Sequence, residues 1–177
     1  MLRRFAGAAA LLLLVPGAVL AHGPSRKKEI TTIEINAPAE KVWAVVGNYQ
    51  DMTWHPAIEK SEATGPMEPE KAKRTLTYKS GHVMTDTLLD YYPEDKKIGF
   101  MTDKEDHKLL PVEGYMSTLS VKDAGGKSMV EWKGAFYRGY VNNDPPPELN
   151  DAAAIKAVTA YQQVGLEGLK AKIEGGK

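Results

Sequence analysis

The sequence predicts an α+β fold: a curved antiparallel sheet of six or seven strands, two short helices and a long C-terminal helix. Two observations predict it. Between residues 57 and 140 one strand-like segment follows another with no helical pattern between them, which indicates a single antiparallel sheet. From Glu148 to Glu174 the apolar residues recur at helical spacing instead, which predicts one long helix.

Residues 1–21 have the pattern of a secretory signal peptide. Arg3 and Arg4 precede an apolar run over residues 8–15, and Ala21 closes a small-residue cleavage site. The run is shorter than the roughly 20 residues that a membrane span needs. We therefore expect cleavage after Ala21, export to the periplasm and no stable membrane anchor.

The remaining chain has the length of one domain, which we expect over residues 29–175. Residues 22–28 are polar and contain glycine and proline, so they are predicted to be a flexible lead-in.

A strand and two short helices are expected first. Ile and Thr alternate over residues 29–36, which is typical of a strand. Pro38 then opens a helix that ends near Gly47. Residues 49–54 are predicted to form a second short helix or turn, because Pro56 stops it.

The later strands are separated by turn residues such as Ser80-Gly81 and the segment 123–126. They are predicted at residues 57–63, 72–79, 82–92, 97–102, 113–122 and 128–140. A proline-rich breaker at 142–147 precedes the long helix.

One stripe of that helix is expected to face inward, formed by Ile155, Val158, Gln162, Gly165, Leu166, Leu169 and Ile173. Gly165 and Gly168 each cost about 1 kcal/mol against alanine in a helix interior. Glycines kept at that cost mark close backbone approach or room for something bulky.

The order of elements, with the segments Ile33–Trp43 and Met52–Pro56, resembles the START/Bet v 1-like (SRPBCC) superfamily, which includes the polyketide cyclase/dehydrase-like proteins. Together with the signal peptide and the start His22-Gly23-Pro24, the chain is similar to its MxaD-type members, small periplasmic proteins linked to methanol oxidation. The resemblance covers nearly all of residues 22–175 and implies the helix-grip fold.

A curved sheet with a helix across its concave face encloses a cavity unless side chains fill it. The large residues on the strands, with neighbours from helix and turn, either line an apolar ligand cavity or form an ordinary filled core. These cavity-lining candidates are Trp54, His55, Tyr78, Met84, Met101, Tyr115, Trp132, Phe136, Tyr137, Tyr140 and Tyr161.

Composition excludes several classes of function. Lys+Arg and Asp+Glu both total 23, so no basic excess points to nucleic acid. The chain has no cysteine, which rules out disulfides, thiolate zinc sites and cysteine nucleophiles. We expect no cofactor and no metal, since no phosphate-binding glycine loop or zinc motif is present.

The histidines are dispersed. His55 is either a group near the cavity mouth or a turn residue fixed by Pro56, and His82 and His107 are expected to be solvated. After cleavage His22 would carry an α-amine and an imidazole, a pair that can chelate copper, or it would be a disordered tail. The carboxylate groups Asp86/Asp90 and Asp103/Glu105/Asp106 are interpreted as surface positions.

Three functions are consistent with these observations. The resemblance implies a non-enzymatic periplasmic accessory protein that helps a quinone-dependent methanol dehydrogenase engage its cytochrome c acceptor. A second hypothesis is a carrier of a hydrophobic small molecule or lipid between sheet and helix. The third is a cyclase- or hydratase-like enzyme, with Tyr137, His55 or Tyr115 as the first residues to test.

Overall fold

Seven antiparallel strands form one sheet in the computed structural model, which describes residues 23–175. The signal-peptide and His22 predictions therefore lie outside the described residues. In chain order the elements are β1 (Lys27–Ile35), α1 (Ala39–Val46), β2 (Ile58–Thr64), β3 (Lys73–Tyr78), β4 (Val83–Tyr92), β5 (Lys97–Lys104), β6 (Val112–Asp123), β7 (Ser128–Arg138), the 3₁₀ turn η1 (Pro147–Leu149) and α2 (Asp151–Gly175).

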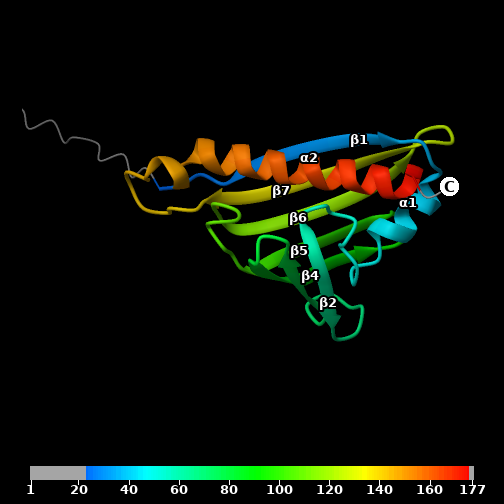
Figure 1. Cartoon of the computed structure of the whole chain (residues 1–177), viewed down its shortest axis with the longest axis horizontal. Helices are drawn as coiled ribbons and strands as arrows, with labels where there is room; N and C mark the ends of the chain where they lie inside the picture. The colour runs from blue at the N-terminus through cyan, green and yellow to red at the C-terminus, as the bar shows by residue number, and fades with distance from the viewer. Residues whose placement is uncertain (1–22, 176–177) are drawn as a thin grey trace, which may run out of the picture.

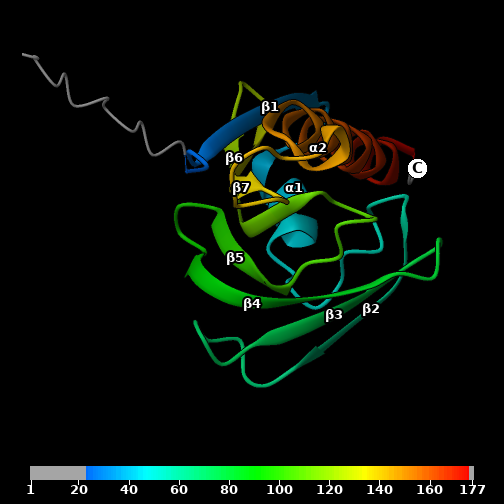
Figure 2. The same ribbon diagram turned by 90° about the vertical axis from the view of Figure 1, so that its left-hand side faces the viewer.

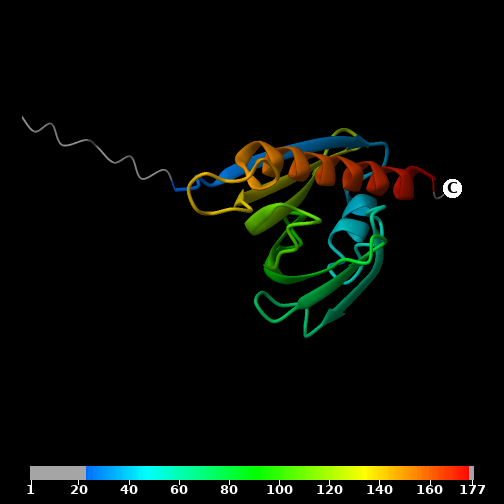
Figure 3. The same ribbon diagram turned by 60° about the vertical axis from the view of Figure 1, so that its left-hand side comes forward.

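The strands lie in the order β1-β7-β6-β5-β4-β3-β2, so the first strand pairs with the last. The sheet bends strongly, and α2 lies along its concave side next to β1 and β7 (Figures 1 and 3). The short helix α1 lies at the end where α2 finishes (Figure 1). This is the helix-grip architecture that the sequence predicts.

The second short helix is absent from the described residues, where the chain after α1 forms a run of turns instead. The Asp51 carboxylate accepts hydrogen bonds from the Thr53 amide (2.8 Å) and the Thr53 hydroxyl (2.6 Å). Such a local bond offers the backbone an alternative to a helical turn. Pro56 then disfavours helical backbone at His55.

The long helix begins three residues later than the sequence predicts. The Asn150 side chain accepts a hydrogen bond from the amide of Ala153 (2.9 Å), as a helix-capping residue does. The inward stripe agrees with the prediction except that Ala154 is buried and Ile155 only half-buried.

Gly165 and Gly168 mark close approaches of α2 to the turn that carries Trp54, His55 and Pro56. A Cβ at position 165 would lie 2.5 Å from a His55 ring carbon, and one at 168 would lie 2.5 Å from the Trp54 carbonyl oxygen. Both separations are far below van der Waals contact. The helix tolerates two costly glycines because they let this turn seat against it.

Within the described part of the chain, no helix is long and apolar enough to cross a membrane.

Candidate functional site

Most of the predicted cavity-lining residues meet in the interior between the sheet and α2. The side chains that face this interior are Trp54, His55, Tyr78, Met84, Tyr115, Trp132 and Phe136, all buried, and Tyr161, which is half-buried. They come from strands on both sides of the bend, from the turn after α1 and from α2. Successive side chains of a strand point to opposite faces of the sheet, which accounts for the shared direction of the residues that come from strands.

Five of these rings form one aromatic group. The Tyr161 ring stacks on His55 with centroids 4.4 Å apart, and Trp132 meets Tyr161 edge-on at 5.4 Å. The Tyr161 hydroxyl lies 3.1 Å from that of Tyr78. Trp54 packs edge-on against Trp132 at 5.9 Å. These contacts show that the rings pack on one another at this end of the interior.

Met101, Tyr137 and Tyr140 do not join that group. Phe100 and Thr102 are buried on β5, so Met101 between them faces the opposite side of the sheet. Tyr137 likewise follows the buried Phe136 and is 37% exposed. Tyr140 lies beyond the end of β7 and is also exposed. The strand predicted to run to residue 140 in fact ends at 138, which removes the alternation that would have turned Tyr140 inward.

His55 is held in one neutral form by bonds at both ring nitrogens. Its Nε2 lies 3.0 Å from the Tyr161 carbonyl oxygen, which can only accept, so Nε2 carries the hydrogen. Its Nδ1 accepts a bond from the Ala57 amide at 3.2 Å. Burial lowers the pKa of His55 to about 4. Because both ring nitrogens are engaged, the structure favours the interpretation of His55 as a residue that fixes the turn. The ring has no free lone pair that could take a proton from a substrate.

The buried apolar side chains form two clusters rather than one. The larger surrounds α1 and includes Trp132, Leu119 and Leu166. The smaller consists of Leu110, Val112, Tyr115, Phe136, Ala154 and Val158. Tyr161 packs against both.

A row of small or polar residues separates the clusters on three elements, and we call it the junction: Ser117, Gly134 and Gln162. On each element the junction residue lies between a residue of one cluster and a residue of the other, as Gln162 does between Val158 and Leu166. A Cβ at Gly134 would lie 2.8 Å from Gln162 Nε2 and 2.9 Å from Tyr115 Cε2. The absence of a side chain at 134 therefore lets Tyr115 and Gln162 approach each other across β7.

Two polar atoms at the junction have no hydrogen-bond partner among the described residues: the Tyr115 hydroxyl and Gln162 Nε2. Tyr115 is 2% exposed and Gln162 0%. The other end of the Gln162 amide is fixed, since Oε1 accepts from the Thr31 hydroxyl at 2.8 Å. A buried donor without an acceptor costs about 1–3 kcal/mol, so this pair needs an explanation.

A β-bulge aims Tyr115 at this place. The register of β6 on β7 shifts between Glu113 and Met116, and Gly114 there adopts a left-handed φ of 60°. The extra residue changes the alternation so that Val112, Tyr115 and Ser117 all face inward. Sequence patterning alone cannot place such a bulge, although the glycine is its one local signal.

The interpretation of Asp86 as a surface residue is wrong. Asp86 is 1% exposed and its Oδ2 accepts a bond of 2.7 Å from Nη2 of Arg74, itself 4% exposed. The Arg74 guanidinium lies between the rings of Tyr49 and Phe100, at 4.5 and 4.7 Å from their centroids. Alternation on β3 and β4 turns both charged residues inward, where each serves as the other's counter-charge.

Burial dominates the ionisation of this interior. It raises the pKa of Tyr115 to about 12 and raises the pKa values of Tyr78 and Tyr161 as well. Burial also raises the pKa of Asp86, while Arg74 and Thr102 act in the opposite direction. The tyrosines are therefore neutral hydrogen-bonding groups near neutral pH.

A surface groove lies beside the smaller cluster, between the segment that precedes β6 and the start of α2. Figure 2 shows these two backbone segments at the end of the molecule that faces the viewer. It has a volume of about 640 Å³ and is lined by His107, Lys108, Leu109, Pro111, Glu148, Leu149 and Ala157. Leu109 packs against the larger cluster and Ala157 against the smaller one. The groove therefore reaches both clusters from outside.

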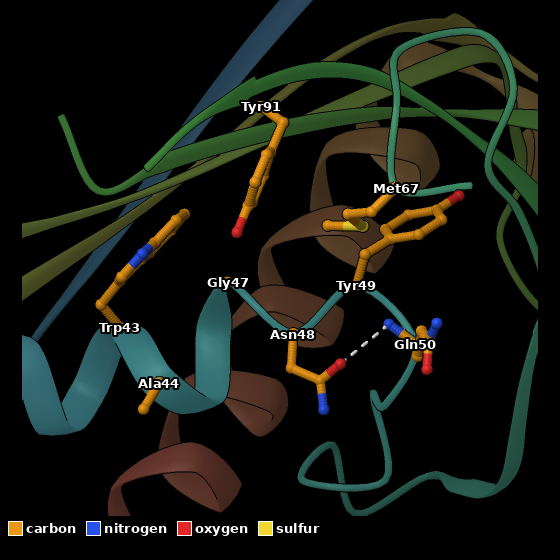
Figure 4. Close-up of a pocket in the computed structure, with 8 residues that line it drawn as sticks. All are labelled: Trp43, Ala44, Gly47, Asn48, Tyr49, Gln50, Met67 and Tyr91. Atoms are coloured by element: carbon orange, nitrogen blue, oxygen red, sulfur yellow. Dashed lines mark hydrogen bonds between the residues drawn. The ribbon is translucent and has the colours of Figure 1, made fainter. Parts of the chain in front are cut away.

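A second hollow of about 320 Å³ lies outside the grip, between α1, the turn after it and β4 (Figure 4). Trp43 and Tyr91 form one wall, with ring centroids 6.0 Å apart, and Met67 lies across from them (Figure 4). No acidic, basic or histidine side chain lines it. It is separate from the interior between the sheet and α2.

His82 and His107 each pair with a carboxylate near the surface. His82 Nδ1 lies 2.6 Å from Asp106 Oδ2, and His107 Nε2 lies 2.7 Å from Glu113 Oε1. Both histidines are half-buried rather than fully solvated. Across residues 23–175 no group of three His, Asp or Glu side chains is arranged to hold a metal ion.

Residues 30–174 match the model of the family described as polyketide cyclase / dehydrase and lipid transport. The chain belongs to this family. A comparison with curated proteins finds no match.

Solved structures of low sequence identity share the fold. Protein XoxI from Bacillus cereus is 23% identical over 82% of this chain and 94% of its own, with a TM-score of 0.67. Norcoclaurine synthase from Thalictrum flavum, in complex with dopamine and hydroxybenzaldehyde, is 17% identical over 96% and 99%, at 0.66. A START superfamily protein from Mycobacterium smegmatis is 17% identical over 84% and 97%, at 0.65.

Proposed function

We propose that this protein is a periplasmic carrier that binds an apolar small molecule or lipid between the sheet and α2. The observation that carries the proposal is the pair of unpartnered polar atoms on Tyr115 and Gln162, buried where two apolar clusters meet. A ligand with an apolar body and one polar group suits such a place.

The groove lined by Leu109 and Ala157 is the opening in this proposal. The ligand body lies in the groove and between the side chains of the smaller cluster, with its polar end toward Gln162. Lipid transport is part of the family's description, which supports a carrier. The signal-peptide pattern of residues 1–21 supports the periplasmic location.

Filling the groove tests this opening. We expect the environment-sensitive dye phenylnaphthylamine to bind the purified protein saturably, with a rise in fluorescence. Ala157→Trp places an indole in the groove and is expected to weaken binding at least tenfold, because about 1.4 kcal/mol of lost contact is a factor of ten. Ala160→Trp is the matched control on the exposed side of α2 and is expected to bind as the wild type does.

Equal affinities in the two tryptophan variants would contradict the groove as the opening. Absence of dye binding to the wild type would contradict the carrier itself. Thermal melting of each variant establishes that the comparison is made between folded proteins.

The accessory role in methanol oxidation is the second candidate. It rests on the similarity of the exported chain to MxaD-type proteins, which implies methanol dehydrogenase and its cytochrome c as partners. Small and transient contacts are typical of electron-transfer encounters, so such a role needs no interior ligand. The two candidates thus differ in whether the junction must bind a small molecule.

A further inference from the structure

We propose, on the basis of the carrier function above, that the ligand is an uncharged carbonyl compound whose oxygen accepts hydrogen bonds from Tyr115 and Gln162 together. A ketone, an ester or an amide with an apolar body belongs to this class. The structure supports each part of this statement separately: the donors, their direction and the absence of a counter-charge.

The two groups act as donors. Tyr115 offers a hydroxyl hydrogen, and Gln162 offers the hydrogens of Nε2 because its Oε1 is occupied by Thr31. Neither Tyr115 Oη nor Gln162 Nε2 has a partner among the described residues. Burial raises the pKa of Tyr115, and Ser117 and Gln162 lie close enough to its hydroxyl to lower that pKa in part. Neither makes a hydrogen bond of good geometry with the hydroxyl, so both donors are available to an acceptor from outside the chain.

The two donors point to the same place. A Cβ at Gly134 would contact the donor Gln162 Nε2 and the ring carbon Cε2 of Tyr115, so the Tyr115 ring and the Gln162 amide lie side by side over this glycine. Gln162 is also close enough to the Tyr115 hydroxyl to oppose the rise in pKa that burial causes there. Trp132 adds no competing acceptor, since its indole donates to the Ser117 hydroxyl at 3.1 Å. Two convergent donors suit one carbonyl oxygen, which has two lone pairs.

The ligand's polar group is uncharged because the junction has no counter-charge to offer. Arg74 and Asp86 are the charged side chains buried within residues 23–175, and they neutralise each other. Arg74 Nη1 is also occupied by the Tyr49 carbonyl at 3.0 Å. A carboxylate brought to the junction would be desolvated without a cation, which is strongly unfavourable.

Three probes of one shape test the proposal: acetylnaphthalene, ethylnaphthalene and naphthoate. We expect the ketone to bind the wild-type protein at least tenfold more tightly than either the hydrocarbon or the carboxylate, because only the ketone satisfies the buried donors without bringing a charge. Calorimetric titration gives the three affinities. The infrared carbonyl stretch of the bound ketone is expected to move to lower frequency through the two hydrogen bonds.

The double variant Tyr115→Phe/Gln162→Leu removes both donors while keeping similar side-chain volume. It is expected to bind ketone and hydrocarbon equally and to abolish the infrared shift. Tyr92→Phe removes an exposed hydroxyl at the end of β4, outside both the junction and the groove, and is expected to retain the preference.

The outcomes separate the two proposals. Failure of all three probes to bind would contradict the carrier function. Binding of ketone and hydrocarbon with equal affinity would leave the carrier intact and overturn the carbonyl assignment. A ketone preference that survives in the double variant would also overturn it, and tightest binding by naphthoate would overturn the uncharged class.

Discussion

Asp86→Asn is expected to lower the free energy of unfolding by about 3–5 kcal/mol, the cost of leaving a buried charge without its partner. Arginine is a cation in proteins, and only 4% of Arg74 is exposed. The asparagine can still accept a hydrogen bond but cannot neutralise the guanidinium. Urea unfolding followed by circular dichroism measures the change.

Asp95→Asn is the matched control, since Asp95 is exposed in the turn between β4 and β5. It is expected to change stability by less than about 0.5 kcal/mol. The double variant Arg74→Met/Asp86→Leu is expected to lose less than the two single variants combined, because it removes both charges at once. An Asp86→Asn protein as stable as the Asp95→Asn protein would show that the Asp86 carboxylate does not compensate the buried charge of Arg74.

Lowering the pH from 6.5 to 4 is expected to reduce the free energy of unfolding by about 3 kcal/mol through His55. The folded pKa of His55 is about 4, below the 6.5 of a free imidazole. Above pH 6.5 the ring is neutral in both states and contributes nothing to the pH dependence. Between pH 6.5 and 4 the unfolded chain gains a proton that the folded protein does not, so stability falls with pH across this window.

Stability measured in urea at several pH values tests this sign and window. His55→Gln removes the titrating ring while its amide can still donate to the Tyr161 carbonyl, and we expect a flatter profile between pH 6.5 and 4.5. His82→Gln is expected to keep the fall, since His82 lies in a surface pair. A wild-type profile that is flat over this window, or a His55 ring proton resonance that titrates near pH 6.5 in the folded state, would contradict the account.

Local patterning accounts for most of the fold. Alternation along the strands and the helical stripe on α2 are properties of neighbouring residues, so the sequence predicts them within a few positions. Where capping or turn residues compete with helix formation, as at Asn150 and Asp51, the expected boundaries shift. Of the two roles expected for Gly165 and Gly168, close approach or room for something bulky, the structure shows the close approach, and only the structure identifies the partner segment.

The interior polar groups could not be predicted in the same way. A charged residue on an inward-facing strand position is interpreted as a surface residue until its partner is known, and Arg74 lies on a different strand from Asp86. The direction of Tyr115 depends on a bulge at Gly114, and that of Tyr140 on where β7 ends. These are tertiary facts that one sequence does not contain.

Tryptophan resonances provide the most direct test of ligand binding between the sheet and α2. The chain has three tryptophans. Trp132 lies in the interior beside the junction, and Trp43 lines the outer hollow (Figure 4). A nitrogen–proton correlation spectrum shows one indole signal for each, and Trp43→Phe assigns the outer one.

Titration of the protein with phenylnaphthylamine is expected to shift the Trp132 indole signal and leave the Trp43 signal in place. A shift of the Trp43 signal alone would place the ligand in the outer hollow and contradict the account. If no indole signal moves, the interior binds no such molecule, and the accessory role becomes the better proposal.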